Sequence, residues 1–283
     1  MIRADLFLIY SSMKTKNLYV TSLFVFGLVG CAPSPQTASF TKDSAIIGGR
    51  LTSASSEIAK HLVMIYTEEN HSICTGTLIH SRVVLTAAHC VSKEADSMII
   101  TFGVDPLSGA YVKRTSDAFI IHDDYNKKEY FNRNDIALIR LSKPAPKAYV
   151  PALLPTKKLP LKVDFNFTAL GFGRALESPS AQDFKNNSGR LRETILKIEE
   201  IYSEDSQFKV DQQSGRGVCS GDSGGPAIMR FSGKNYVVGI ASAVWWQEGT
   251  PENTCSQKSI YMNVKHYRDW ILENLDGLVK KSP

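Results

Sequence analysis

The sequence has no long run of like charges and no stripe of Lys or Arg interleaved with aromatic residues. Its formal net charge is +5 over 283 residues, and the basic residues are scattered. Domains that bind nucleic acids present a clustered basic surface. A nucleic-acid partner is therefore not expected, and the charges indicate an ordinary solvated surface.

Cysteine is scarce, and its spacing does not suit a metal site. There are five cysteines, and no two of them form a Cys-x-x-Cys pair. Only Cys90 has a neighbouring histidine, His89. Structural zinc sites draw their ligands from closely spaced pairs of such residues, so we expect no metal and no cofactor.

Long apolar stretches are also missing, apart from one near the N-terminus. Residues 18–29 are mostly apolar and follow Lys14 and Lys16. This stretch is too short for a stable membrane-spanning helix, and its order of charged and apolar regions is typical of a signal peptide. We therefore expect residues 1–30 to be a signal peptide, in which Met13 would be the more compact start.

The signal peptide ends in Leu28-Val29-Gly30-Cys31, which resembles the lipobox of bacterial lipoproteins. The resemblance implies a lipid on Cys31, and residues 31–45, rich in Ser, Pro, Ala and Thr, would be a lipid-anchored linker or pro-segment. Because no second stretch of membrane length follows, we expect an exported protein of the bacterial envelope, attached to the membrane only through Cys31. The remaining four cysteines can pair in three ways, and spacing alone does not choose among them.

From Ile46 onward, short apolar runs alternate with turn residues, without a strand–helix–strand rhythm. This pattern predicts an all-β sandwich or barrel. The runs are His61–Tyr66, Cys74–Leu85, Met98–Phe102, Ala118–Ile121, Ile136–Leu141, Phe165–Leu170, Ala227–Met229, Tyr236–Val244 and Ser259–Val264. Near the end, apolar residues repeat at helical spacing, which predicts one packing helix. They are Val264, Tyr267, Trp270, Ile271 and Leu275.

Three local strings carry residue types suited to chemistry. They are Leu85-Thr86-Ala87-Ala88-His89-Cys90, Asn134-Asp135-Ile136-Ala137-Leu138-Ile139 and Cys219-Ser220-Gly221-Asp222-Ser223-Gly224-Gly225-Pro226. Taken singly, each has an ordinary structural interpretation, namely a core histidine, a turn before a strand and a tight glycine-rich loop.

Together the three strings resemble the trypsin/chymotrypsin family of serine proteases. The order His, Asp, Ser is the order of that family, and it differs from the order in subtilisins and α/β-hydrolases. The resemblance extends from Ile46 to about Leu275. Further matching strings are Ile46-Ile47-Gly48-Gly49, Cys74-Thr75-Gly76-Thr77-Leu78-Ile79, His122-Asp123-Asp124-Tyr125, Gly171-Phe172-Gly173 and Gly239-Ile240-Ala241-Ser242.

The resemblance implies a fold and a disulfide pattern. Residues 46–283 would form an all-β protease domain of two six-stranded antiparallel β-barrels, with the active site between them and a C-terminal α-helix. The four cysteines of this domain would pair as Cys74–Cys90 and Cys219–Cys255.

The resemblance also assigns catalytic roles that elementary chemistry explains. A Ser hydroxyl is a weak nucleophile at neutral pH, so Ser223 needs a base, and His89 would take its proton. Asp135 would hold the second imidazole nitrogen and stabilise the imidazolium. The backbone N–H groups of Gly221 and Ser223 would bind the oxyanion. We therefore expect a monomeric serine endopeptidase that acts on proteins or peptides.

Asp222 has a second role by resemblance, in activation. It would pair with an ammonium group that cleavage of the Ala45–Ile46 bond creates on Ile46. Because Ala45 is small and apolar, we expect the enzyme itself or a similar enzyme to make this cut. The cut lies after Cys31, so it would also release the domain from its lipid.

A substrate pocket can be matched as well. The residue six positions before Ser223 often lies at the base of the specificity pocket, where an Asp selects Arg and Lys; here it is Gly217. Val218 would add bulk near the base. The matched wall residues are Ser242, Val244 and Ser259. Because Val244 and Ser259 resemble the narrow pocket of elastases, we expect a preference for small apolar residues before the cut.

Two other classes of protein fit part of the sequence. A catalytically silent binding lipoprotein with the same fold would usually lack a triad residue, whereas His89, Asp135 and Ser223 are all present. A plain structural lipoprotein explains Cys31 but leaves the three strings to chance. Reaction of Ser223 with a fluorophosphonate would distinguish an enzyme from both.

Overall fold

The computed structural model describes residues 46–68, 71–92, 97–125, 134–175, 187–202, 206–245 and 255–280. All of them belong to one compact unit. The expected signal peptide, the lipid site at Cys31 and the residue Ala45 lie outside the described residues. No helix within the described ranges is long and apolar enough to cross a membrane.

The first half of the domain forms a closed antiparallel barrel in the strand order β2-β3-β4-β7-β6-β5. Its strands are β2 (Leu62–Thr67), β3 (Ser72–His80), β4 (Val83–Thr86), β5 (Ile99–Phe102), β6 (Val112–Ile121) and β7 (Ala137–Leu141). Strands β4 and β7 are buried along their whole length, because the barrel interior covers one face and neighbouring segments cover the other. Strand β4 ends shortly before His89, and β7 begins shortly after Asp135.

The second half forms a sheet in the order β1-β9-β10-β13-β12-β11-β8, which closes through an additional pairing of β8 with β9. The short β1 (Arg50–Leu51) is attached to β9 at the edge of this barrel. The other strands are β8 (Asn166–Gly171), β9 (Arg192–Ile201), β10 (Gln207–Asp211), β11 (Pro226–Phe231), β12 (Lys234–Trp245) and β13 (Lys258–Asn263). The prediction of two six-stranded barrels is therefore confirmed.

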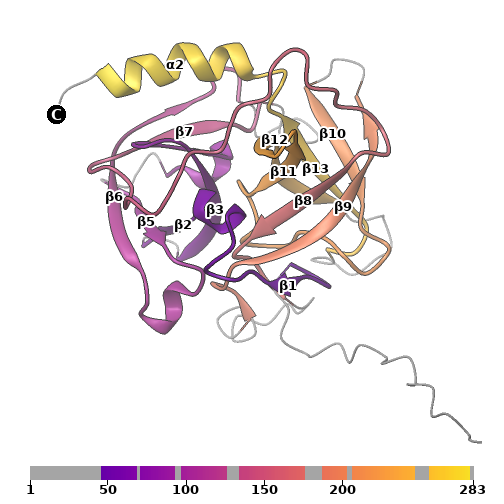
Figure 1. The fold of residues 1–283 in the computed structure, drawn as a ribbon, viewed down its shortest axis with the longest axis horizontal. Coiled ribbons are helices and arrows are strands. Elements are labelled where there is room, and N and C mark those ends of the chain that lie inside the picture. Colours follow the sequence, from indigo (N-terminus) through magenta and orange to yellow (C-terminus); the bar gives the residue numbers. More distant parts are fainter. Residues whose placement is uncertain are drawn as a thin grey trace, which may run out of the picture. The chain divides into compact units, whose positions relative to one another are not determined.

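The helical elements are short, apart from the one near the C-terminus. Among the described residues they are the 3-10 turns η1 (Ile58–His61), η2 (Ala88–Cys90) and η3 (Pro106–Ser108) and the α-helix α2 (Arg268–Lys280). Although α2 follows the second barrel in sequence, it packs against β4, β6 and β7 of the first barrel (Figure 1). The C-terminal segment thus ties the two barrels together.

Several predicted element boundaries differ from the structure. The run Cys74–Leu85 is two strands, because the chain turns at Ser81 and Arg82 between β3 and β4. The helix begins at Arg268 and not at Val264, because residues 264–267 form turns in which Tyr267 donates to the carbonyl of Asn263.

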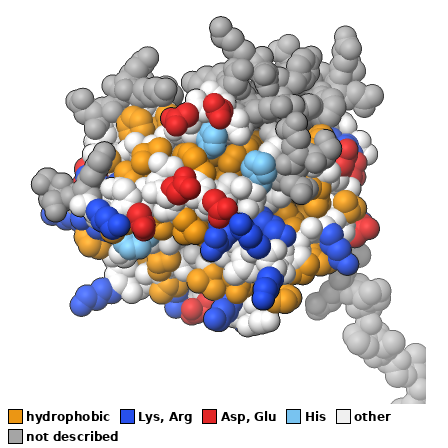
Figure 2. Space-filling model, turned by 90° about the horizontal axis from the view of Figure 1, so that it is seen from above, with side chains coloured by type: hydrophobic (Ala, Val, Ile, Leu, Met, Phe, Trp, Pro, Cys, Tyr) orange, Lys and Arg blue, Asp and Glu red, His pale blue; other side chains and the backbone are white. Residues whose placement is uncertain are grey.

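Strands β9 and β10 were not predicted. Both contain buried residues alternating with more exposed ones, and the charged side chains of Glu193, Lys197, Glu199, Glu200, Lys209 and Asp211 dilute the apolar signal. On the outer surface, acidic, basic and hydrophobic side chains lie side by side, as the face in Figure 2 shows.

Candidate active site

The side chains of Asp135 and His89 are joined by a pair of hydrogen bonds. Asp135 precedes β7 and is fully buried, whereas His89 lies in η2 and is 29% exposed. Nδ1 of His89 lies 2.7 Å from Oδ2 of Asp135, and the backbone N–H of His89 donates to Oδ1 at 2.9 Å. A carboxylate oxygen only accepts, so Nδ1 carries the proton and Nε2 keeps its lone pair. The imidazole is therefore held in the tautomer that a general base requires.

Two further contacts fix Asp135 in place. The hydroxyl of Ser242, on β12 of the second barrel, donates to Oδ2 at 2.6 Å. Asn134, which precedes Asp135 in the chain, has a φ of +57° and accepts a hydrogen bond from the hydroxyl of Tyr267 at 2.9 Å. A positive φ is tolerated by Asn better than by most residues. Asp135 is thus positioned by both barrels and by the turn that leads into α2.

Ser223 lies half-buried on the loop between Cys219 and β11. Gly221 has a φ of +97°, and a Cβ there would lie 2.7 Å from the Cα of Gly173, so only glycine fits the turn. The backbone N–H groups of Gly221 and Ser223 make no hydrogen bond to any described residue. They are two neighbouring donors that a developing oxyanion could accept from.

Thr75 on β3 joins the first barrel to the loop of Ser223. Its backbone N–H donates to the carbonyl of Ser223 at 2.8 Å. Its buried hydroxyl accepts from the N–H of Phe172 at 3.1 Å and lies 3.0 Å from the carbonyl of Gly221. Because an N–H can only donate, the hydroxyl proton must point to Gly221. Thr75 therefore fixes the loop that carries Ser223.

Two disulfides within the described residues flank this junction, and they have the pairing that the resemblance implies. Cys74–Cys90 links the residue before Thr75 to the residue after His89, and Cys219–Cys255 ties the start of the Ser223 loop to the segment before β13. The sulfur of Cys90 lies 3.6 Å from the carbonyl oxygen of Ser223. No hydrogen bond joins His89 to Ser223 among the described residues, as is common before a substrate binds.

Asp222 carries the second buried carboxylate of the site. It accepts hydrogen bonds from the N–H of Cys219 at 2.9 Å and of Gly173 at 2.8 Å. Complete burial raises the pKa of Asp222 to about 7, although both hydrogen bonds and the charge of Arg192 favour the ionised form. The buried Tyr261 also faces it, and burial together with Asp222 raises the pKa of that phenol. A further positive charge would stabilise the ionised carboxylate.

The segment that begins at Ile46 packs on the loop that precedes Ser223. Ile46 is fully buried and has a φ of +49°, which is strained for a β-branched residue. Ile47 forms an isolated bridge with Gly217, whose N–H donates to the Ile47 carbonyl at 3.0 Å. The start of the domain thus lies against the region expected to form the pocket.

A cavity of about 240 Å³ opens beside Ser223. Its lining residues are Val218, Cys219, Ser220, Ser223, Ala241, Ser242, Ala243 and Val244, and none of them is charged. Of the expected pocket residues, Val218, Ser242 and Val244 lie in this lining. Gly217 and Ser259 do not; both are buried behind it, and Ser259 lies opposite Val244 in the β12–β13 pair.

The structure brings His89, Asp135, Gly221, Asp222 and Ser223 into one region. The one group of His, Cys, Asp or Glu side chains among the described residues with metal-like spacing is Cys74, His89 and Cys90. Its two sulfurs form a disulfide, so they are not free ligands.

Sequence reasoning missed the part played by Thr75 and the contact of Ser242 with Asp135. The signal available for Thr75 was its place inside a string that matches the family. The local sequence does not show that its hydroxyl bonds to Gly221 and Phe172. Ser242 was expected only as a pocket wall, and the structure adds its hydrogen bond to Asp135.

Comparisons with known proteins agree with this geometry. Residues 46–271 match the protein family described as Trypsin. The chain is also similar to the CLIP domain-containing serine protease B4 of Anopheles gambiae, with 27% identity over 233 residues. That match covers 71% of this chain and 62% of the mosquito protein, so the chain spans less than two thirds of that relative's length.

The junction at Thr75 gives a prediction about stability. Thr75→Val keeps the shape of the side chain but leaves the Phe172 N–H and the Gly221 carbonyl without their partner. We expect the free energy of unfolding to fall by about 2 kcal/mol or more, measured by urea denaturation. Thr75→Ser retains the hydroxyl and should cost only about 1 kcal/mol for the lost methyl. Equal losses in the two variants would show that the hydroxyl does not hold the loop.

Proposed function

Because the chain belongs to the trypsin family of serine proteases, we propose that it is a serine endopeptidase that cleaves peptide bonds through an acyl-enzyme on Ser223. The strongest support is the hydrogen bond between Nδ1 of His89 and Oδ2 of the buried Asp135, at 2.7 Å. It leaves Nε2 as a base on the side of the imidazole away from the carboxylate. Ser223 and two unpaired N–H donors complete the required set.

The proposed reaction has two halves. His89 takes the proton of the Ser223 hydroxyl as the oxygen attacks the substrate carbonyl. The N–H groups of Gly221 and Ser223 donate to the oxyanion, and the imidazolium then protonates the leaving amine. Water enters, His89 removes its proton as the water oxygen attacks the acyl carbon, and the imidazolium returns that proton to the Ser223 oxygen as the ester bond breaks and the acid product leaves. Asp135 stays ionised and stabilises the imidazolium throughout.

Labelling by a fluorophosphonate tests the nucleophile. Wild-type protein cleaved before Ile46 should be labelled, because a base and an oxyanion site activate only one serine. Ser223→Ala should abolish labelling, and His89→Ala should lower kcat on a peptide substrate by roughly 10⁴-fold or more. Ser108→Ala, at an exposed serine in η3, is the control and should change neither. A folded, cleaved wild type that takes no label would favour the silent binding protein.

We propose that the substrate residue before the cut is small and apolar. The cavity of about 240 Å³ is smaller than most ligand sites. Val218 and Val244 have the bulkiest side chains of its lining, which holds no carboxylate that could pair with Arg or Lys. Acceptance of Ala, Val, Ser or Thr follows, and cleavage of a peptide library measures it.

We further propose that the chain is a zymogen activated at the Ala45–Ile46 bond. The strained φ of Ile46 supports this, because a free N-terminal residue no longer has a φ and the strain would vanish on cleavage. In the uncleaved chain, the charge of Arg192 does not offset the burial of Asp222, whose pKa is raised to about 7. The new ammonium group would supply a second positive charge that stabilises the ionised carboxylate. Ala45 fits the small pocket, so the cut is autocatalytic or made by a similar enzyme.

This activation predicts a pH dependence that differs before and after cleavage. In the uncleaved Ser223→Ala chain, folding favours protonated Asp222, whose pKa rises from 3.8 to about 7. The resulting stabilisation is present below about pH 4 and is lost as the pH rises to about 7, a change on the order of 4 kcal/mol. After cleavage by an added protease, the Ile46 ammonium should lower the pKa of Asp222, so the folded protein should no longer lose stability as the pH rises to about 7.

Urea unfolding of both forms at several pH values measures the difference. Asp222→Asn in the uncleaved chain is the control, because an amide does not titrate and the slope should disappear. Parallel stability curves for cleaved and uncleaved protein would contradict the pairing.

We also propose that the domain is exported. The two disulfides support this, because such bonds persist in oxidising compartments. If Cys31 carries a lipid, cleavage after Ala45 should move the protein from membranes to the soluble fraction. Active protein with a free Ile46 amine that stays on membranes after a salt wash would contradict release.

A further inference from the structure

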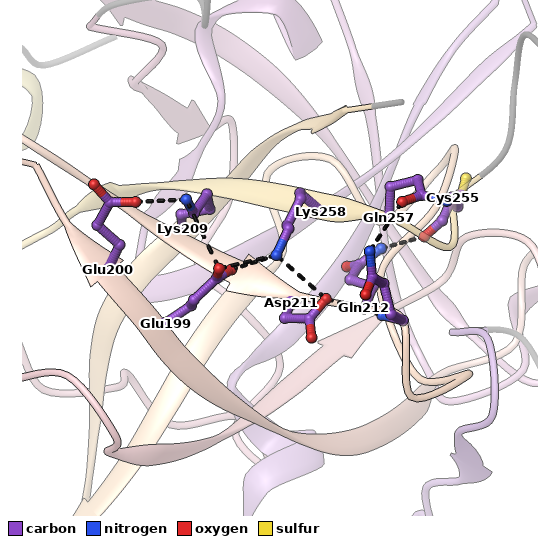
Figure 3. A network of polar contacts seen from close by, with 9 residues as sticks. Glu199, Glu200, Lys209, Asp211, Gln212, Cys255, Gln257 and Lys258 are labelled. Carbon is purple, nitrogen blue, oxygen red and sulfur yellow. Dashed lines mark hydrogen bonds and ion pairs between the residues drawn. The ribbon is translucent and has the colours of Figure 1, made fainter. Parts of the chain in front are cut away.

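Gln212 is a fully buried polar residue behind the wall of the substrate pocket. It follows β10 and is 1% exposed. Its Oε1 accepts from the N–H of Val218 at 2.8 Å, and its Nε2 donates to the Val218 carbonyl at 3.1 Å. Nε2 also donates to the carbonyl of Cys255 (Figure 3). Both amide hydrogens are used, so the side chain holds the main chain of Val218 in one orientation.

The same side chain fills the space beside Gly217. A Cβ on Gly217 would lie 2.2 Å from Cδ, 2.4 Å from Nε2 and 2.7 Å from Cγ of Gln212. These distances are shorter than any ordinary contact between such atoms. The amide cannot easily move aside, because its three hydrogen bonds would break. Gln212 therefore occupies the volume that any side chain at position 217 would need.

A ladder of ion pairs holds the backbone from which Gln212 projects. Lys258 on β13 lies 2.9 Å from Glu199 on β9 and 3.5 Å from Asp211 on β10. Lys209 extends the ladder to Glu200 (Figure 3). The N–H of Gln212 donates to the carbonyl of Gln257 at 3.0 Å. Strands β9, β10 and β13 are thus fixed relative to one another at the point where Gln212 leaves β10.

We propose that Gln212 is a specificity-determining residue that closes the floor of the substrate pocket. It does so by holding Val218, which lines the pocket, and by excluding any side chain at Gly217. The pocket therefore ends at Val218 and admits only a small substrate side chain. The proposal rests on the proposed function, since it concerns the substrate of the same site.

Substrate selectivity of matched variants tests it. Gln212→Ala frees Val218 to move, so the ratio of kcat/KM for Leu over Ala before the cut should rise by about tenfold or more. The control is Gln213→Ala, at the exposed neighbouring glutamine, and it should leave the ratio unchanged. If Gln212→Ala lowers kcat/KM equally for both substrates, the residue has only a structural part and the proposal is wrong.

A second measurement needs no catalysis. In the Ser223→Ala background, Gly217→Ala should lower Tm by about 4 °C or more, because its Cβ overlaps Gln212. Combined with Gln212→Ala, the same change should cost far less, whereas combined with Gln213→Ala it should cost the full amount. Equal costs in all three backgrounds would overturn the steric argument.

The Tm measurement and fluorophosphonate labelling together distinguish failure of the proposed protease activity from failure of the proposal about Gln212. A chain that shows the Tm coupling but takes no fluorophosphonate label refutes the protease and keeps the contact of Gln212 with Gly217. If Gln212→Ala does not fold, Gln212→Met replaces it, because it keeps the length of the side chain and loses all three hydrogen bonds. The selectivity ratio should then still rise, and an unchanged ratio would overturn the proposal.

Discussion

The hydroxyl of Thr75 is the contact on which the geometry of the site depends. His89 and Asp135 belong to the first barrel, and Ser223 belongs to the second. The backbone N–H of Thr75 donates to the carbonyl of Ser223. Its hydroxyl donates to the carbonyl of Gly221 and accepts from the N–H of Phe172. Removing it would leave buried groups of the second barrel without partners, at a cost comparable to a sizeable fraction of the stability of a domain. Together with the hydrogen bond of Ser242 to Asp135, this contact joins the first barrel to the loop that carries Ser223.

The two buried aspartates illustrate how surroundings assign different roles to one residue type. Asp135 receives two hydrogen bonds from His89 and one from Ser242, so its charge is matched in the folded chain. Asp222 receives two backbone hydrogen bonds, and burial still raises its pKa to about 7. The carboxylate of Asp135 therefore orients the imidazole of His89, whereas the carboxylate of Asp222 would be stabilised in its ionised form by a further positive charge. This difference is the basis of the proposal that the site depends on a cut before Ile46.

Much of this arrangement could be predicted from the chain itself. The strings around His89, Asp135 and Ser223 carry their chemistry in local order, and the alternation of short apolar runs indicated barrels. Strands β9 and β10 escaped because their outward positions carry the charges of the ion-pair ladder. Thr75 and Gln212 escaped for another reason. The partners of Thr75 lie across the barrel interface, and the partners of Gln212 are main-chain groups that any residue carries, so no local pattern shows that either polar side chain will be buried and satisfied.

The central claim is that Ser223 forms a covalent acyl-enzyme within a site assembled from both barrels. Pre-steady-state release of the leaving group from a small activated ester of an apolar acid tests it most directly. We expect a burst of product close to one equivalent of cleaved enzyme, followed by slower turnover as water attacks the acyl group. Folded, cleaved protein that gives no burst and no turnover would contradict it.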